Sequence, residues 1–295
     1  MKSRTFVKWA GGKTQLVDSI VKLMPQSLSD DGVNTYVEPF LGSGALFFEI
    51  AHRFPDVNFL LNDKNKSLIN TYHVVKNKPN GLVRKLEKIC DYYCDLDQNS
   101  KAFFFQEMKK QYNEVLKKPI NYPTIKEAAL FIFINKTCFN GLYRLNRNGS
   151  FNVPHGNVSG AIFNKTNILD ASKSLKKAQL FSLDFKEFIN LHIPNPEKTF
   201  FYIDPPYTVK HGNNGFLAYN EKIFSWEDQV SLATLSASLR SHGSKVMVSN
   251  AHHSDVINLY EEIGFHMSVV SRSSVIGGSH AKRERVSECI FTSYN

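Results

Sequence analysis

Short apolar runs alternate with helical patterns in the first quarter of the chain. Residues 35–40 form an apolar run that ends in a glycine-containing turn, and residues 45–51 carry the broad apolar face of a helix. A second apolar run at 57–61 is followed by a helical pattern over about 64–76. Strands that alternate with helices in this order predict the beginning of a doubly wound α/β sheet.

The same alternation returns in the C-terminal part of the chain. Asp184 is expected to cap a short helix, and the residues at 226–241 predict a longer one. Two polar stretches, 208–223 and the basic 272–285, are predicted as loops. Apolar runs predict the strands of this part at 179–183, 200–203, 245–249, 265–270 and 289–292.

The middle of the chain has a different pattern. Residues 81–135 favour helices, whereas residues 137–160 are irregular and rich in Asn and Gly. The dipeptide Asn148-Gly149 is typical of a β-hairpin turn. We therefore predict one α/β domain, formed by residues 1–64 and 176–295, that is interrupted by a helical and hairpin domain at 65–175.

The charge of the chain indicates a kind of partner. Among 295 residues, Lys and Arg number 36 and Asp and Glu number 27, which gives a net charge of +9. A basic protein of this size is expected to bind a polyanion, and nucleic acid is favoured over a membrane surface because no amphipathic lipid-anchoring stretch stands out.

Cysteine spacing and the length of the apolar runs argue against several classes of protein. None of the cysteines, at positions 90, 94, 138 and 289, forms a Cys-x-x-Cys pair, so we predict neither a zinc site nor a disulfide framework, and no metal. No apolar run approaches the length of a membrane span, and the first residues lack the apolar core of a secretory signal. We expect reduced thiols in a cytoplasmic protein without a membrane partner.

The Gly-Lys-Thr tripeptide at 12–14 suggests a phosphate-binding loop, but the upstream half of that motif is missing. The motif requires a glycine five positions before Gly12, where the sequence has Val7. An ATPase is therefore not expected. The turn either seats a ligand that carries one carboxylate, with Trp9 as an apolar wall, or caps a helix and leaves Lys13 in solvent.

A second glycine turn predicts a nucleoside site. Gly42 and Gly44 lie between a predicted strand and a helix, and Asp63 ends the next strand. In dinucleotide-binding folds an acid at about this distance binds ribose hydroxyls. Phe47 occupies the place of the third glycine of that fingerprint, which favours an adenosine with a smaller appendage than a pyrophosphate. The alternatives are an ordinary tight turn at the glycines and a helix N-cap at Asp63.

The Asp-Pro-Pro-Tyr sequence at 204–207 follows the apolar run 200–203 and offers acceptors beside an aromatic ring. The two prolines fix the backbone and cannot donate to a sheet. The Asp204 carboxylate, the Pro205 carbonyl and the Tyr207 ring suit a planar substrate that carries an amino group. The alternative is a rigid corner between a strand and a loop.

Taken in order, these motifs resemble those of the Dam-type (alpha-group) DNA adenine methyltransferases. The matching segments are Lys8–Lys13, Glu38–Gly44, Asn62-Asp63 and the 204–207 motif, and residues 139–156 are similar to the DNA-contacting hairpin of that family. The resemblance implies a Rossmann-like methyltransferase sheet that binds S-adenosylmethionine, with residues 65–175 as the inserted target-recognition domain.

The resemblance also implies roles for individual residues. Catalysis would fall to Asp204, Pro205 and Tyr207. The cofactor residues would be Trp9, Gly11, Gly12 and Lys13 at the methionine part, Phe40, Gly42 and Gly44 along the cofactor, Asp63 at the ribose, Asp184 and Phe185 at the adenine, and also Asp204. The residues at the DNA would be Asn140, Leu142, Tyr143, Arg144, Asn146 and Pro154.

The activity implied is methyl transfer to the exocyclic amine of adenine in a short, GATC-like site of double-stranded DNA, by base flipping. The source would be bacterial, phage or plasmid-borne, with a role in restriction-modification, beside a cognate endonuclease, or in regulation, and the enzyme would be a monomer or weak dimer. The alternatives are a methyltransferase for an RNA base or another planar amine, and a non-catalytic DNA-binding relic. Asp before the prolines argues against protein glutamine as substrate, and the complete motif set argues against a relic.

Overall fold

The computed structural model describes residues 3–28, 32–118, 122–158, 160–191, 195–209, 224–274 and 284–295. The chain forms two compact units. The first comprises Met1–Gly12, Gly42–Pro55 and Asp63–Ser182, and the second comprises Lys13–Leu41, Asp56–Asn62 and Leu183–Asn295. Several of the predicted motifs lie where the chain passes from one unit to the other, between residues 12 and 13, 41 and 42, and 62 and 63.

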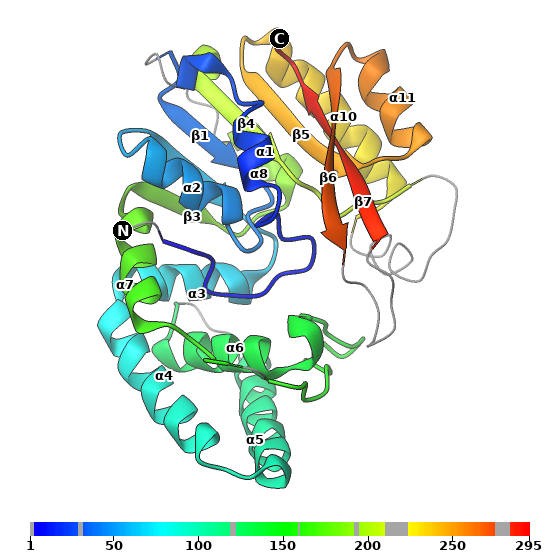
Figure 1. Ribbon diagram of the computed structural model, residues 1–295. Helices are drawn as coiled ribbons and strands as arrows, with labels where there is room; N and C mark the ends of the chain where they lie inside the picture. Colours follow the sequence, from blue (N-terminus) through cyan, green and yellow to red (C-terminus); the bar gives the residue numbers. More distant parts are fainter. Residues whose placement is uncertain are drawn as a thin grey trace. The chain divides into compact units, whose positions relative to one another are not determined.

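The second unit contains most of a mixed β-sheet (Figure 1). In this unit the strands have the order β2-β1-β4-β5-β7-β6. The neighbours β2, β1, β4 and β5 are parallel, while β7 is antiparallel to both β5 and β6. The strands are β1 (Thr35–Glu38), β2 (Asn58–Asn62), β4 (Thr199–Ile203), β5 (Lys245–Ala251), β6 (His266–Ser274) and β7 (Glu284–Thr292).

The helices of this unit are α1 (Val17–Val21), α8 (Phe185–Leu191), α10 (Trp226–Ser241) and α11 (Ser254–Glu262). Strand β4 is buried over its whole length, as expected for a central parallel strand, and its sequence is Thr-Phe-Phe-Tyr-Ile. Tyr36 of β1 packs between Phe59 and Phe200, with ring centroids 5.9 and 5.8 Å away. These apolar contacts fix the strands whose carboxyl ends carry the predicted catalytic motif.

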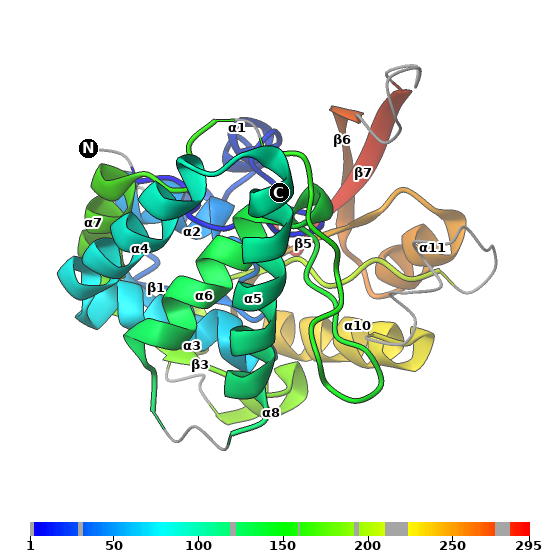
Figure 2. The same cartoon turned by 90° about the horizontal axis from the view of Figure 1, so that it is seen from below.

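The first unit is mainly helical. Its elements are α2 (Ala45–Arg53), α3 (Lys66–Asn77), α4 (Pro79–Cys94), α5 (Gln98–Leu116), α6 (Ile125–Thr137), α7 (Lys165–Ser174) and strand β3 (Ala178–Phe181). Helix α6 is buried on nearly every side, because α3, α4 and α5 all pack against it (Figure 2). Its Ala-, Leu-, Phe- and Ile-rich sequence suits this central place, since a helix that is apolar all round must be enclosed.

A hairpin follows α6, and this confirms the turn predicted at Asn148-Gly149. Isolated bridges pair Cys138 with His155 and Leu145 with Phe151. At the tip, the Asn146 N–H donates to the Ser150 carbonyl over 2.8 Å, and Gly149 has a positive φ of 71°. The positive φ is confined to the glycine of the Asn-Gly dipeptide, and glycine adopts it without strain.

The structure corrects some predicted boundaries. Strand β6 runs to Ser274 and β7 begins at Glu284, so the loop predicted over 272–285 is wrong at both of its ends. Antiparallel pairing of Ser274 with Glu284 extends the ladder over polar residues that carry no apolar signal. Residues 210–223 of the other predicted loop lie outside the described part of the chain. The division into domains at 65 and 175 stays a prediction.

Among the described residues, no helix combines the length and the apolar character needed to cross a bilayer. The same residues contain no group of three or more His, Cys, Asp or Glu side chains placed to hold a metal ion.

Candidate active site

The predicted catalytic motif lies in the second unit, at the carboxyl end of β4. Asp204 is the first residue after this buried strand, and its Oδ1 lies 2.8 Å from Lys13 Nζ. The Lys13 side chain is 5% exposed and the Asp204 side chain 17% exposed. The lysine of the Gly-Lys-Thr turn is therefore buried against a carboxylate of the protein, and the solvated-lysine alternative is wrong.

Two further side chains complete this cluster. Lys13 Nζ lies 4.7 Å from the centre of the Tyr207 ring, which places a cation over an aromatic face. The Tyr207 hydroxyl donates to Glu288 Oε2 over 2.7 Å, and the same oxygen lies 3.5 Å from Lys13 Nζ. We call Lys13, Asp204, Tyr207 and Glu288 the catalytic cluster.

Burial controls protonation in the catalytic cluster. It raises the pKa of Asp204 to about 6, with Lys13 opposing this rise and Glu288 adding to it. Burial and the two neighbouring carboxylates also raise the pKa of Tyr207 well above its usual range, so this phenol stays protonated and donates. At neutral pH, Asp204 is therefore a carboxylate, which accepts hydrogen bonds, and its pKa is close enough to 7 for it to take up a proton.

Phe40 and Phe185, both predicted at the cofactor, lie together in the second unit. Their ring centroids are 5.4 Å apart, and Phe224 lies 5.7 and 5.5 Å from them. Phe224 is a member of this cluster that sequence reasoning missed, because a single Phe before a helix is an ordinary apolar residue. The three rings form an aromatic site next to the start of α8.

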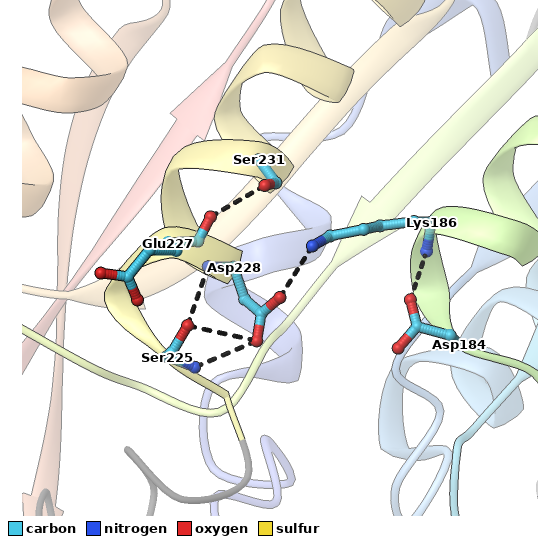
Figure 3. A network of polar contacts seen from close by, with 6 residues as sticks. All are labelled: Asp184, Lys186, Ser225, Glu227, Asp228 and Ser231. Carbon is cyan, nitrogen blue, oxygen red and sulfur yellow. Dashed lines mark hydrogen bonds and ion pairs between the residues drawn. The ribbon is translucent and has the colours of Figure 1, made fainter.

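Polar contacts hold the start of α8 in place (Figure 3). Asp184 Oδ1 accepts from the Lys186 N–H over 3.1 Å, as predicted for a residue that caps this helix. Lys186 Nζ in turn lies 2.8 Å from Asp228 Oδ1 in the first turn of α10. Asp228 also forms a capping box with Ser225, so the beginnings of α8 and α10 are joined through one carboxylate.

Asn62 fixes the ends of two strands in the same unit. It is 1% exposed, and its side-chain amide donates to the carbonyls of Pro39 and Leu183 over 3.0 and 3.1 Å. Its side-chain oxygen accepts from the Leu183 N–H over 2.9 Å. This one side chain therefore pairs with backbone groups of Pro39 and Leu183, the residues that precede Phe40 and Asp184.

The remaining predicted cofactor residues lie in the first unit. Asp63 Oδ2 accepts from the Gly42 N–H and Oδ1 accepts from the Asn65 N–H, each over 2.9 Å. Asn65, and not Asp63, is the N-cap of α3. Asp63 thus closes the glycine turn, and burial raises its pKa above the ordinary aspartate value in spite of these donors.

Glycine is required at several positions in the turns of the first unit, because a side chain there would clash or strain the backbone. Gly42 has a φ of 49°, and a Cβ there would lie 2.9 Å from Trp9 Cδ1. Gly44 has a φ of 69° at the N-cap of α2, a conformation that other residues rarely adopt. Gly11 also has a positive φ of 75°, while Gly12 donates its N–H to the Trp9 carbonyl over 3.1 Å.

The hairpin of the first unit exposes most of the residues predicted at the DNA. Asn140, Arg144, Asn146 and Pro154 are exposed, and Leu142 is half-buried. Asn140 has a φ of 53°, the one positive value at a non-glycine position in the described part of the chain. Arg144 Nε donates to Asn152 Oδ1 over 2.9 Å, and Asn146 Oδ1 accepts from the N–H groups of Asn148 and Ser150.

Tyr143 differs from the other predicted DNA residues. Its ring stacks on Trp9 with centroids 5.7 Å apart, and its hydroxyl lies 3.1 Å from that of Tyr112. Burial raises its pKa above the usual value for tyrosine. The structure therefore places it inside an aromatic cluster, whereas the neighbouring Phe139, which was not singled out, is 51% exposed.

Comparison with known proteins identifies the family. A family model for D12 class N6 adenine-specific DNA methyltransferases matches residues 9–276. The chain belongs to this family. The sequence motifs predict this family, an α/β fold and adenine-specific DNA methyltransferase activity. All three predictions are confirmed.

Individual relatives cover nearly the whole methyltransferase. It is 34% identical over 286 residues to the Type II methyltransferase M.MjaIII of Methanocaldococcus jannaschii, with 96% of each chain covered. It is 32% identical over 299 residues to the Type II methyltransferase M1.LlaDCHI of Lactococcus lactis subsp. cremoris, covering 99% of this chain and 95% of the relative. It is also 27% identical over 290 residues to a DNA adenine methylase of Vibrio cholerae, covering 98% and 95%.

Two buried polar residues of the methyltransferase escaped sequence reasoning. Glu288 of β7 comes directly before the apolar residues Cys289–Phe291 and is buried with them, and an acid next to such a run is a signal that could have been noticed. Asn135 of α6 donates to the carbonyls of Lys8 and Gly141 and accepts from the Lys8 N–H. It thereby joins the hairpin to the segment before Trp9, and nothing in the sequence of a buried helix predicts that contact.

The first prediction concerns the turn that Asn135 holds. Gly141 has a φ of 65°, and a Cβ there would lie 2.5 Å from Lys8 Cβ, whereas Gly149 has a φ of 71° and open space around it. We expect Gly141→Ala to lower the free energy of unfolding by about 2 kcal/mol or more, and Gly149→Ala by about 1 kcal/mol, because only the first adds a clash to the backbone strain. Urea unfolding measures both, and equal losses would contradict the close approach to Lys8.

Proposed function

We propose that the methyltransferase transfers a methyl group from S-adenosylmethionine to the exocyclic amine of adenine in a short, GATC-like site of double-stranded DNA, after the base has been flipped out of the duplex. The observation that carries this proposal is the placement of the Asp204 carboxylate at the end of β4, partly exposed and in contact with Lys13. In α/β folds this end of the sheet is where ligands bind.

The residues proposed for the cofactor suit its chemistry. The catalytic cluster contains two carboxylates and one ammonium, which favours a cationic ligand such as a sulfonium. The Phe40 and Phe185 rings offer faces for an adenine. At Gly42, a Cβ would meet Trp9, so only glycine leaves this turn unblocked. The full proposed set is Trp9, Gly11, Gly12, Lys13, Phe40, Gly42, Gly44, Asp63, Asp184, Phe185 and Asp204.

The mechanism follows from the weakness of the substrate nucleophile. The lone pair of the adenine amine is delocalised into the ring, so the amine attacks poorly. The Asp204 carboxylate and the Pro205 carbonyl accept the two amine hydrogens, which localises the lone pair on nitrogen. When bound, the cofactor supplies an electrophilic methyl carbon and leaves as a neutral thioether. Asp204 stabilises the positive charge that develops on nitrogen and then takes up the proton.

Tyr207 is proposed to stack on the flipped adenine. The target atom cannot be reached inside a base stack, so an enzyme that modifies it must extrude the nucleotide into a pocket. Glu288 holds the ring of Tyr207 at its hydroxyl, and Lys13 lies over one face of the ring. An aromatic face adds about 1–3 kcal/mol of stacking for a bound base.

The hairpin is proposed to read the DNA sequence. Arg144 is exposed near its tip, and its contact with Asn152 uses Nε, so the two terminal amino groups are the donors that would meet a guanine edge. Asn140, Leu142, Asn146 and Pro154 are proposed to lie at the DNA beside it. Tyr143 is proposed to support them from within, through its stacking on Trp9.

The biological setting remains a prediction. Two relatives are named Type II methyltransferases and a third a DNA adenine methylase. We propose a role either in a restriction-modification system, with an endonuclease that shares the site, or as a solitary regulatory enzyme. We also propose that residues 65–175 form the recognition domain. The enzyme is proposed to be a monomer or weak dimer in the cytoplasm.

The second prediction tests Asp204 directly. We expect Asp204→Ala to lower the rate of tritiated methyl transfer to DNA by at least about 1,000-fold. The substitution removes the carboxylate that accepts a hydrogen bond from the adenine amine and then takes up its proton. Asp18→Ala, at an exposed acid of α1, serves as the control for loss of an acidic residue. Identification of labelled N6-methyl-2′-deoxyadenosine after digestion tests the base, and wild-type transfer by Asp204→Ala would remove the residue from this role.

The pH dependence gives a third prediction. Because the pKa of Asp204 is raised to about 6, the carboxylate is protonated as the pH falls below that value and stops accepting hydrogens. The single-turnover rate should therefore be level above about pH 7 and fall about tenfold for each pH unit below 6. A rate that stays level down to pH 4.5, with the protein still folded, would contradict the assignment.

The fourth prediction concerns sequence reading by Arg144. We expect Arg144→Ala to reduce discrimination at one guanine of the site by about 5- to 150-fold, since one bidentate contact is worth about 1–3 kcal/mol. Arg147→Ala, at another exposed arginine of the hairpin, should weaken DNA binding equally for all sequences. Long-read methylation profiling of DNA from cells that express each variant distinguishes the two results, and unchanged specificity for Arg144→Ala would contradict base reading.

A further inference from the structure

Glu288 is a buried carboxylate of the catalytic cluster that belongs to none of the sequence motifs. It lies on β7, where its backbone pairs with Ala251 of β5 and Val270 of β6, and it is 2% exposed. A carboxylate at this depth costs several kcal/mol of desolvation unless it is paired and hydrogen-bonded. Its two partners in the cluster are Tyr207, through a 2.7 Å hydrogen bond, and Lys13, at 3.5 Å.

We propose that Glu288 is a positioning residue for methyl transfer. It fixes the Tyr207 ring through the phenol hydroxyl and shares the Lys13 ammonium with Asp204, so that Asp204 can turn its carboxylate to the substrate amine. This inference rests on the proposed function of Asp204 and Tyr207.

Glu288 and Lys13 hold the Tyr207 side chain from two sides. A phenol has one proton to donate, and the short contact gives that proton to Glu288 Oε2. The hydroxyl is at the far end of the side chain, on the long axis of the ring, so a hydrogen bond there fixes the direction of that axis. Lys13 Nζ lies over the same ring at 4.7 Å, which braces Tyr207 from its face.

The ammonium of Lys13 is shared between two carboxylates. Lys13 Nζ lies 2.8 Å from Asp204 and 3.5 Å from Glu288, so the two carboxylates compete for one cation. When Asp204 accepts hydrogens from adenine, Lys13 keeps a buried counter-charge in Glu288. Without the charge of Glu288, Lys13 would hold Asp204 more tightly and compete with the substrate amine for the same oxygens.

The surrounding charges give this idea a measurable consequence. Glu288 raises the pKa of Asp204 and Lys13 lowers it, while the neighbouring tyrosines stay protonated because their own pKa values are raised. Removal of the Glu288 charge should therefore lower the pKa of Asp204. In the described residues, the titratable groups that shift the pKa of Asp204 are Lys13, Glu288 and Tyr207. Asp204 in turn raises the pKa of Tyr36 and of Tyr202, and the buried carboxylate of Glu38 acts on the same two tyrosines.

The experiment uses the full chain with Glu288→Gln, which keeps the size and an acceptor for the Tyr207 hydroxyl but removes the charge. We expect the maximal rate of methyl transfer to fall about tenfold or more, with KM values for DNA and cofactor within about threefold of wild type. In the ligand-free protein, carbon-13 NMR of labelled aspartate carboxyls should show the Asp204 titration moved to lower pH. Glu288→Asp, which keeps the charge but is one methylene shorter, should restore the wild-type titration.

Two further variants separate positioning from folding. Cys289→Ala alters the next residue of β7, whose side chain points to the opposite face of the sheet, and should leave the Asp204 titration unchanged. In a Tyr207→Phe background, which already lacks the hydroxyl contact, Glu288→Met, which removes the acceptor as well as the charge, should cost less activity than in wild type. Equal costs in both backgrounds would overturn the link through Tyr207.

The outcomes distinguish this inference from the proposed function. If wild type labels adenine in DNA while Glu288→Gln keeps the wild-type rate and Asp204 titration, Glu288 has no positioning role and the function stands. If wild type labels no DNA adenine, the proposed function fails and the positioning role fails with it. A lower rate together with an Asp204 titration moved to lower pH, in a variant that melts cooperatively, supports the inference.

Discussion

The mechanism proposed for this methyltransferase depends on a buried ion pair at the end of a central β-strand. Lys13 and Asp204 are in contact at 2.8 Å, with little of either side chain exposed. A carboxylate in this environment remains ionised at neutral pH only because the ammonium offsets part of its desolvation, and its pKa is still raised to about 6. The same two effects produce a strong acceptor that is also able to take up a proton.

The order of the strands in the sheet explains why Glu288 lies beside the Lys13–Asp204 ion pair. Strand β4 lies between β1 and β5 in the second unit, and all three are parallel, so the segments that follow β1 and β4 emerge at one edge. Strand β7 inserts antiparallel beside β5, with Glu288 opposite Ala251, the last residue of β5. The reversal of one strand therefore brings a carboxylate from the C-terminal end of the chain to the carboxyl ends of the parallel strands.

Local sequence signals were sufficient for much of the fold. The strands at 35–38, 58–62 and 199–203 coincide with apolar runs, and α2 and α10 begin within a residue of their predicted starts, after a glycine turn and a capping serine. The ends of β6 and β7 were not predictable in this way. Their outer residues are polar and are held by pairing with each other, which is a tertiary interaction that periodicity does not report.

The candidate site shows where sequence motifs reach their limit. Motifs located Asp204, Tyr207 and Lys13, because glycines and prolines mark the backbone positions that the chemistry requires. They gave no information on which side chains hold these residues, since Glu288 belongs to no motif and the Asn62-Asp63 motif assigned no role to Asn62. Their importance becomes clear from their hydrogen bonds alone.

The hairpin shows the same limit, because a motif does not report how its side chains pack. Tyr143 was assigned to the DNA from its motif, yet its ring is stacked on Trp9 and its hydroxyl is paired with Tyr112. Asn135 ties Lys8, next to Trp9, to Gly141 in the same hairpin. These contacts join the hairpin directly to the segment that carries Trp9. Within the first unit, the residues proposed to read DNA and the tryptophan proposed to hold the cofactor are therefore parts of one packed structure.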